Sequence, residues 1–239
     1  MSEMVSNYDE LLQKFENEVE YEYSSRIEEL QKCENCIELA SNNEDEKIIY
    51  RKMLVLMVYS YFEGFCKKSL MIYADYINKL DLSTSEVTLG LAATSLGKEF
   101  DLLENTSRHP LELKGDLIDK DSMLHKYSRR IEFLGNYEHH FSKKVKIPDT
   151  TVNTESNLKS YVLKSILYKL DIDYTTVDPF QNTINMLLGK RNSIAHGDRV
   201  RGVDALKYDD YRSQTLKLMG EIKSIVINSF RNKAFLKTE

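Results

Sequence analysis

The stretch MLVLMVYSYFEGFCKKSLMIYADYI, residues 53–77, decides the fold class of this 239-residue chain. Its apolar side chains fall on more than one face of a helix, which is typical of a central helix buried on several sides. The longest apolar run, Met53–Tyr59, has about seven residues, whereas a membrane span needs about 20. The stretch therefore predicts a buried helix, extending from residue 44 to about residue 80, in a protein with no membrane partner.

An acidic amphipathic helix is predicted before this one, over residues 4–40. Its apolar side chains recur every three or four positions among glutamates: Leu12, Phe15, Val19, Tyr23, Ile27 and Leu30. Ser41-Asn42-Asn43 interrupts this pattern and offers an N-cap to the next helix, and the acidic turn at residues 44–46 suits the helix dipole.

The rest of the chain is also helical in pattern. Further helices are predicted over residues 89–103, 119–138 and 158–170, from Asp178 into the stretch 189–202, and over 205–235, with a long loop at 142–157. Only three prolines and nine glycines break the chain. We expect an all-α bundle of about six to eight helices. We expect it to form a single helical domain over 1–239, with an acidic N-terminal helix at 1–42 and a core at 44–239.

The start of the chain and its cysteines indicate a compartment. MSEMVSNYDELL has neither the basic nor the apolar region of a secretory signal. The cysteines are odd in number (Cys33, Cys36 and Cys66), which is consistent with reduced thiols. These features predict a cytoplasmic protein.

No metal or cofactor is predicted. Cys33 and Cys36 form one C-x2-C pair, but a zinc site needs more ligands and no second pair exists. The chain also has no Gly-rich phosphate loop, no G-x-S-x-G and no H-E-x-x-H. Its composition and motifs therefore argue against an NTPase, a serine hydrolase and a zinc protease.

The stretch GKRNSIAHGDRVRG, residues 189–202, carries the candidate chemistry, because it contains an R-x4-H pair, Arg191 and His196. At about 100° per residue the two lie about 140° apart on a straight helix, so they do not share a face. Either the helix unwinds near Gly197, a good C-terminal residue, or the pair works with a second copy of itself. A purely structural alternative is that Arg191 makes a salt bridge and His196 bonds a nearby backbone group.

The segment Arg191–Gly197, R-N-x-I-A-H-G, resembles the motif of the HEPN superfamily (higher eukaryotes and prokaryotes nucleotide-binding). This form of the motif looks like that of the bacterial HEPN-like ribonucleases of toxin and phage-defence type. Residues 59–65, with their aromatic-Glu-Gly pattern, and residues 157–170 resemble two further segments of that branch. The sequence departs from the H-x-Y extension found in HEPN toxins that are controlled by adenylylation, because Asp198 stands at its third position.

The resemblance implies a metal-independent endoribonuclease whose two motifs face each other in a homodimer. An imidazole such as that of His196 can take the proton of a ribose 2′-hydroxyl or give one to the leaving 5′-oxygen. The guanidinium of Arg191 can hold the scissile phosphate, and Asn192 supports it by orienting the phosphate or the histidine.

Four other residues belong to this hypothesis. The whole chain has a formal charge of −5 and residues 1–50 carry 14 acidic and 4 basic side chains, but the motif segment is locally basic. Lys190, Arg199 and Arg201 are expected to follow the RNA backbone. By resemblance Glu63 faces Arg191 or His196; alternatively it faces solvent at the edge of its helix.

The expected partners are RNA, a second copy of the chain, and an antitoxin or another defence-system protein, in growth arrest or antiphage defence. The alternative function is a catalytically silent HEPN subunit that binds RNA or nucleotides as a sensor or scaffold. RNA cleavage in a chelator, with His196→Ala as the control, separates the two.

Overall fold

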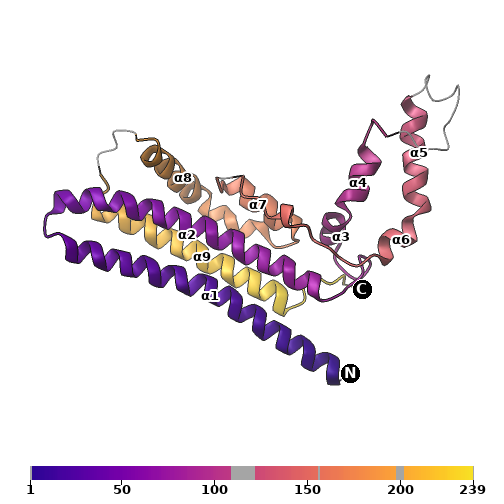
Figure 1. Ribbon diagram of the computed structural model, residues 1–239, viewed down its shortest axis with the longest axis horizontal. Helices are drawn as coiled ribbons and strands as arrows, with labels where there is room; N and C mark the ends of the chain where they lie inside the picture. The colour runs from indigo at the N-terminus through magenta and orange to yellow at the C-terminus, as the bar shows by residue number, and fades with distance from the viewer. Residues whose placement is uncertain (1, 109–121, 156, 198–201, 239) are drawn as a thin grey trace. The chain divides into compact units, whose positions relative to one another are not determined.

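The computed structural model describes residues 2–108, 122–155, 157–197 and 202–238 (Figure 1). The described α-helices are α1 (Ser2–Ala40), α2 (Glu44–Lys79), α3 (Leu89–Ser95), α4 (Gly97–Glu104), α5 (Ser122–Gly135), α6 (Tyr137–Ser142), α7 (Ser160–Lys169), α8 (Gln181–Ala195) and α9 (Ala205–Arg231). Two 3-10 helices, η1 (Asp149–Thr151) and η2 (Tyr174–Phe180), and two isolated β-bridges are also present. The prediction of an all-α fold is confirmed.

The described helices number nine, slightly above the predicted six to eight, because two interruptions were not predicted. Leu96 separates α3 from α4 with φ −87° and ψ 16°, and Asn136 separates α5 from α6 with φ −102° and ψ 14°. At each of these two residues the backbone angles lie in the sparsely populated bridge region, and the change is confined to one position. Such a local change leaves the periodicity of the sequence almost unaltered.

The chain forms two compact units. The first unit consists of Met1–Tyr76 and Asp149–Ala234, and the second of Ile77–Pro148 and Phe235–Glu239. Every predicted site residue that the structure describes belongs to the first unit. The expectation of a single domain over residues 1–239 stays a prediction.

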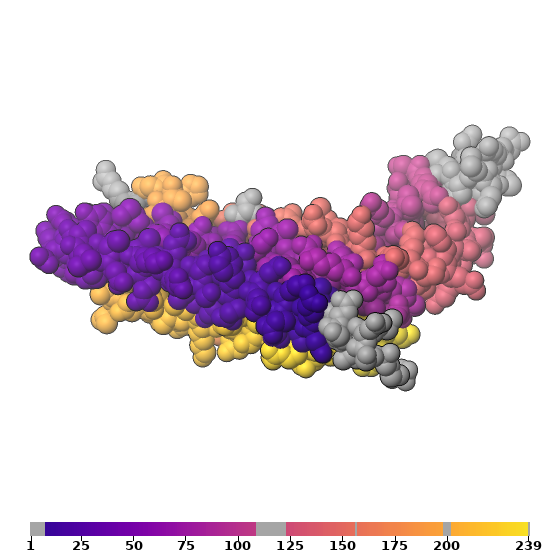
Figure 2. All heavy atoms as spheres, turned by 60° about the horizontal axis from the view of Figure 1, so that its bottom comes forward, coloured from indigo at the N-terminus to yellow at the C-terminus, as the bar shows by residue number. Residues whose placement is uncertain are grey.

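In the first unit α1 lies along α9 (Figures 1 and 2). Aromatic rings join these helices to α2. The ring centroid of Phe15 on α1 is 4.3 Å from that of Phe230 on α9 and 5.4 Å from that of Tyr76 on α2. Such ring pairs contribute about 0.5–1.5 kcal/mol each beyond the area they bury. The contacts explain why the apolar stripe of α1 recurs every three or four residues.

Side chains are buried on several sides of α2, as its sequence predicts. The buried apolar residues of this helix are Leu54, Val55, Val58, Tyr59, Phe62, Phe65, Cys66, Leu70, Ile72, Tyr73, Ala74, Tyr76 and Ile77. Full burial of a large apolar side chain contributes about 1.5–3 kcal/mol. Over the described ranges, no helix is both long enough and apolar enough to cross a membrane.

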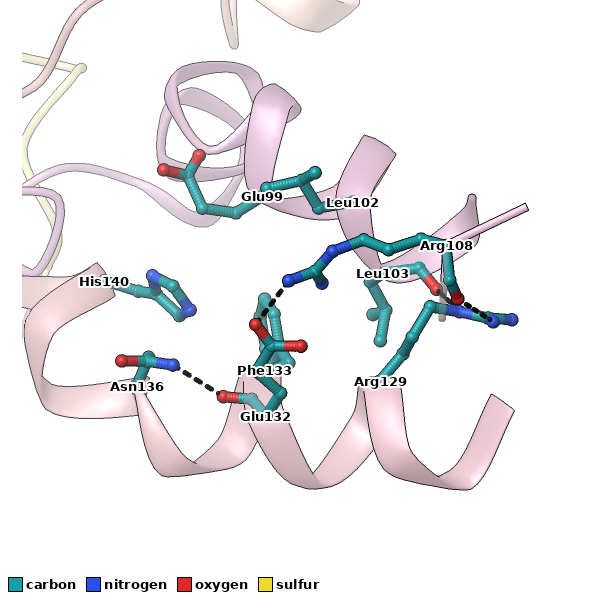
Figure 3. Close-up of a pocket in the computed structure, with 9 residues that line it drawn as sticks. All are labelled: Glu99, Leu102, Leu103, Arg108, Arg129, Glu132, Phe133, Asn136 and His140. Carbon is teal, nitrogen blue, oxygen red and sulfur yellow. Dashed lines mark hydrogen bonds and ion pairs between the residues drawn. The ribbon is translucent and has the colours of Figure 1, made fainter. Parts of the chain in front are cut away.

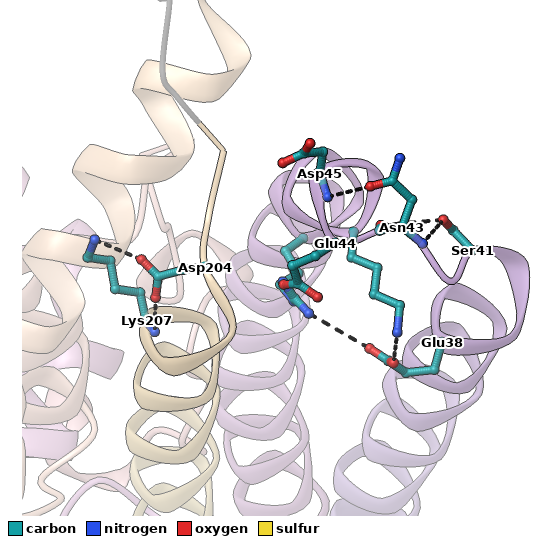
Figure 4. Close-up of polar contacts among 9 residues, drawn as sticks. Glu38, Ser41, Asn43, Glu44, Asp45, Asp204 and Lys207 are labelled. Carbon is teal, nitrogen blue, oxygen red and sulfur yellow. Dashed lines mark hydrogen bonds and ion pairs between the residues drawn. The ribbon is translucent and has the colours of Figure 1, made fainter.

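The start of α2 is capped by the segment that was predicted to cap it (Figure 4). Asn43 Oδ1 accepts a hydrogen bond from the Asp45 N–H at 3.0 Å, and Ser41 Oγ accepts one from the Asn43 N–H at 3.0 Å. Lys47, in the first turn of α2, forms an ion pair with Glu38 near the end of α1. These contacts satisfy backbone donors that the helix itself leaves free and join α1 to α2.

A second layer of helices, α7, η2 and α8, lies on one side of α2 in the first unit (Figure 1). α7 and α8 bury their inward faces, formed by Val162, Leu163, Ile166, Leu167, Thr183, Ile184, Leu187 and Leu188. Leu187 and Leu188 belong to the same buried cluster as Val55 and Tyr59 of α2. This packing fixes the rotation of α8 about its axis, which decides where Arg191 points.

In the second unit α4 packs against α5 beside a small cavity of about 60 Å³ (Figure 3). Arg108 forms an ion pair with Glu132, and Arg129 Nε donates to the carbonyl of Leu103 at 3.0 Å. The rings of Phe100 and Phe133 stack with centroids 5.6 Å apart. None of the described candidate site residues lines this cavity.

Candidate functional site

Arg191 continues the inward-facing stripe of α8. It follows Leu187 and Leu188 by four and three residues, so it lies on the same face of the helix, one turn closer to the C-terminal end. The stripe faces α2, and the guanidinium lies over the ring of Tyr59 with its Cζ 5.4 Å from the ring centroid. A helix face that buries leucines thus carries an arginine against an aromatic ring, an arrangement favoured by the ring quadrupole.

Two amide oxygens orient this guanidinium. Arg191 Nη1 donates to Asn192 Oδ1 at 2.8 Å and to Asn157 Oδ1 at 3.1 Å. A guanidinium has five N–H donors, and Nη1 carries two of them. Within the described residues, Nε and Nη2 make no hydrogen bond. The edge of the guanidinium formed by Nε and Nη2 is therefore turned away from the two asparagines, with the fork geometry that suits an oxyanion.

Tyr59 lies beneath the Arg191 guanidinium and is held firmly in place. Its side chain is 1 % exposed, and its hydroxyl accepts a hydrogen bond from the Leu158 N–H at 2.8 Å. Burial, and then the negative charge of Glu63, raise the pKa of Tyr59 to about 12. The phenol therefore stays neutral at physiological pH and anchors the segment that carries Asn157.

Glu63 lies one turn after Tyr59 on α2 and is partly buried. Its charge acts on the Tyr59 hydroxyl. Within the described residues, no hydrogen bond or ion pair joins Glu63 to Arg191 or to His196. Glu63 therefore acts on the site through the effect of its charge on Tyr59.

His196 occupies the C-terminal end of α8. Its N–H donates to the Asn192 carbonyl at 2.9 Å, and the helix then ends because Gly197 adopts φ +73°. A left-handed glycine at this position is a common helix C-terminus. A helix end near Gly197 was one of the two alternatives that the sequence left open. Arg191 and His196 nevertheless remain apart, and within the described residues no hydrogen bond joins their side chains. The imidazole is exposed.

The basic residues around the motif are only partly described. Lys190 is half-buried on α8. Arg199 and Arg201, the other two candidates for RNA contacts, lie outside the described residues.

The chain returns to α2 directly after this segment. The N–H of Val203 donates to the carbonyl of Ile48 at 3.1 Å. A Cβ on Gly202 would lie 1.9 Å from Ile48 Cγ2 and 2.5 Å from the Ile48 carbonyl oxygen. Only glycine permits this close approach. Gly202 and Val203 thus lie directly against Ile48 of α2.

Tyr59 and Asn157, which the structure brings to Arg191, were not predicted as site residues from the sequence. Both lie in segments that resemble HEPN proteins, and that resemblance was the available signal. Asn157 is separated from Arg191 by 34 residues, and a contact over this distance is not predicted by helical periodicity. No group of three or more His, Cys, Asp or Glu side chains in the described part of the chain is placed to hold a metal ion.

Comparison with known proteins supports the resemblance seen at the motif. No curated protein and no solved structure matches the chain significantly. A family model, by contrast, matches residues 21–228, which include both helices of the site, the Asn157 segment and the R-x4-H pair. The chain belongs to the RiboL-PSP-HEPN family.

Proposed function

We propose that the protein is a metal-independent endoribonuclease that cleaves RNA by attack of the ribose 2′-hydroxyl on the adjacent phosphate. The observation that carries the proposal is the orientation of Arg191. Its guanidinium lies over Tyr59 and is bonded to Asn157 and Asn192, which leaves the Nε and Nη2 edge directed away from them. A preorganised, charged fork of this kind can stabilise the additional charge of a phosphorane-like transition state.

His196 is the proposed acid–base group. It lies at an exposed helix end, within reach of a substrate that approaches from solvent. One imidazole can accept the 2′-hydroxyl proton while a second donates a proton to the leaving 5′-oxygen. Because each chain has one R-x4-H pair, two facing copies of the chain would supply both groups. The proposal therefore includes a homodimer.

Four further residues are proposed to support this chemistry. Asn192 holds the guanidinium of Arg191, and Lys190, Arg199 and Arg201 would follow the RNA backbone. The biological setting that we propose is growth arrest or antiphage defence in the cytoplasm, with an antitoxin or another defence protein as regulator.

The test is cleavage of single-stranded RNA in the presence of EDTA. We expect the wild-type protein to cut and to leave a 2′,3′-cyclic phosphate and a 5′-hydroxyl, whereas Arg191→Ala and His196→Ala should be inactive. Arg130→Ala and His139→Ala, which change exposed residues of the second unit, are matched controls and should retain full activity. Products with 5′-phosphate ends would show that water is the nucleophile and would contradict the role given to His196.

One observation favours a second candidate, a silent HEPN subunit that binds RNA or nucleotides. Within the described residues the His196 side chain has no hydrogen-bond partner, although catalytic histidines are commonly oriented by one. Arg191 alone could hold a phosphate without chemistry. Tight binding of RNA by the wild-type protein, with no cleavage in EDTA or in Mg²⁺, would establish this second function.

A further inference from the structure

The outer face of α7 presents tyrosines to solvent. Tyr161 is 57 % exposed and Tyr168 is 69 % exposed, whereas the intervening apolar residues of the helix are buried. Tyr174, at the start of η2, is 42 % exposed and its ring centroid lies 5.9 Å from that of Tyr168. Exposed aromatic area that forms a row, instead of occurring singly, indicates a surface used for contact.

The spacing places these rings on one line. Tyr161 and Tyr168 are separated by seven residues, which is about two helical turns, so they differ by only about 20° in direction and lie about 10 Å apart along the axis. Tyr174, beyond the C-terminal end of the helix, meets Tyr168 edge to face, with the two ring planes at 72°. A row of π faces at this spacing can accept unpaired bases, because each base has a face that stacks irrespective of its identity.

Positive charge accompanies the tyrosines. Residues 157–170 contain three lysines and no acidic residue. Lys159 Nζ lies 5.5 Å from the ring centroid of Tyr161, and Lys169 is exposed beside Tyr168 in the sequence. The third lysine, Lys164, is paired with Asp178. Acidic residues follow only after the helix, at 171 and 173, so the helix itself complements a polyanion.

The row begins next to the candidate site. Asn157, which binds Arg191, precedes Lys159 by two residues and Tyr161 by four. Ser160 Oγ, at the start of α7, donates to Asn185 Oδ1 on α8 at 3.3 Å. The N-terminal end of α7 is therefore attached to the helix that carries the R-x4-H pair. A strand held at Arg191 can therefore continue along α7.

We propose that the exposed face of α7 is a binding subsite for single-stranded RNA, which extends from the Arg191 site. Unpaired bases stack on Tyr161, Tyr168 and Tyr174, and Lys159 pairs with a phosphate. This inference rests on the proposed ribonuclease function for the direction of the strand, but the subsite itself requires only RNA binding.

The experiment measures affinity in a chain that cannot cut. A fluorescently labelled single-stranded RNA of about 12 nucleotides is titrated with His196→Ala protein in EDTA, and binding is followed by anisotropy. We expect Tyr161→Ala and Tyr168→Ala each to weaken binding about tenfold, and Tyr161→Phe and Tyr168→Phe to remain within about twofold, because stacking needs the ring and not the hydroxyl. Tyr21→Ala is the matched control: Tyr21 is 70 % exposed but lies on the acidic helix α1, so binding should be unchanged.

Two further measurements test whether the subsite prefers single-stranded RNA and whether Lys159 contacts a phosphate. A duplex of the same sequence should bind with no difference between the tyrosine and alanine proteins, since its bases are already stacked on each other. The Lys159→Ala protein should show a salt dependence of log affinity that is shallower by about 0.7, as expected for the loss of one phosphate contact on a single strand.

The outcomes separate this inference from the proposed function. If wild-type protein does not cut RNA but binding still depends on the two rings, the α7 subsite stands and the nuclease proposal is wrong. If the protein cuts and the alanine variants bind as tightly as the parent, the subsite is overturned. It is equally overturned if no RNA binds at low salt, or if the tyrosine variants change the oligomeric state measured by light scattering and leave RNA affinity unaltered.

Discussion

The guanidinium of Arg191 lies over the ring of Tyr59, and the two residues are also joined through a second path. The Tyr59 hydroxyl accepts from the Leu158 N–H, and the neighbouring Asn157 accepts from Arg191. These contacts join three segments into one closed network: α2, the segment before α7, and α8. The position of Arg191 therefore depends on all three segments, and the contribution of each can be tested by a separate substitution.

The Tyr59→Phe substitution tests the hydroxyl. The Tyr59 hydroxyl is the acceptor for the buried Leu158 N–H. Removal of the hydroxyl leaves this N–H without that acceptor and should lower the free energy of unfolding by about 1–3 kcal/mol. The ring remains, so Arg191 keeps its aromatic contact and RNA cleavage should change by less than a factor of about 3. Urea unfolding and initial cleavage rates measure the two effects. Unchanged stability would show that the Leu158 N–H finds another acceptor.

Asn157 is proposed to position Arg191, and two substitutions distinguish this role from a general structural one. Asn157→Ala removes one of the two amide acceptors and should slow cleavage by about tenfold, since a displaced guanidinium holds the phosphate less well. Asn157→Asp keeps the size but supplies a carboxylate that pairs with Arg191 and competes with RNA. It should therefore reduce RNA affinity more than Asn157→Ala does. The reverse order of affinities would argue against a direct contact of Arg191 with phosphate.

Two glycines flank the motif and should respond to alanine in opposite ways. At Gly202 a Cβ would lie 1.9 Å from Ile48 Cγ2, and the chain would have to move away from α2. We expect Gly202→Ala to destabilise the protein by about 1–3 kcal/mol, as overpacking does in other interiors. Gly189 lies inside α8 with nothing within 4 Å of its Cβ position. Gly189→Ala should therefore stabilise by about 0.5–1 kcal/mol. Urea unfolding of both variants checks the pair, and equal effects would contradict the close approach at Ile48.

The free energy of unfolding should also decrease at alkaline pH, because of the Tyr59 phenol. Its pKa in the folded protein is raised from 10.0 to about 12, mainly by burial and then by the charge of Glu63, so folding favours the neutral phenol. This contribution is fully present below pH about 10 and is lost as the pH rises towards about 12. In urea unfolding at pH about 9 and about 11, the wild-type protein should lose more stability between the two values than Tyr59→Phe does. An identical loss in both proteins would show that the phenol is not buried in the folded state.

Helical periodicity predicted the long elements of this fold, because one buried stripe determines each of them. The stripe of α1 and the multi-sided burial of α2 are examples. Periodicity does not indicate which other element, if any, an apolar stripe packs against. On α5 the periodicity places Met123, Leu124, Tyr127, Ile131 and Leu134 on one side. In the structure all of these except the half-buried Leu124 are exposed.

The site shows the same limit. Arg191, Asn192 and His196 could be proposed from a short motif, since their chemistry and spacing are local. The partners that orient Arg191 come from α2 and from the segment before α7, and their approach depends on tertiary packing of Leu187 and Leu188. No local pattern encodes that packing.

The last prediction concerns which chains supply Arg191 and His196. Within one chain the two side chains are not joined, and His196 follows the helix turn that directs Arg191 towards Tyr59. We therefore expect the arginine of one copy to act with the histidine of the other. A hybrid dimer, purified through two different tags, combines an Arg191→Ala chain with a His196→Ala chain and keeps one arginine and one histidine on opposite chains. It should cut RNA measurably although both parent homodimers are inert.

The matched control places the same two residues in one chain. It pairs a wild-type chain with a chain that carries both Arg191→Ala and His196→Ala, so it also keeps one arginine and one histidine. Each hybrid retains a single imidazole, and loss of the second acid–base group should lower its rate by about 10²–10⁴ relative to the wild-type dimer. If the residues act across the interface, the first hybrid is the faster of the two. A fast control and an inert first hybrid would mean that Arg191 and His196 meet within one chain, which requires the last turn of α8 before Gly197 to open when RNA binds.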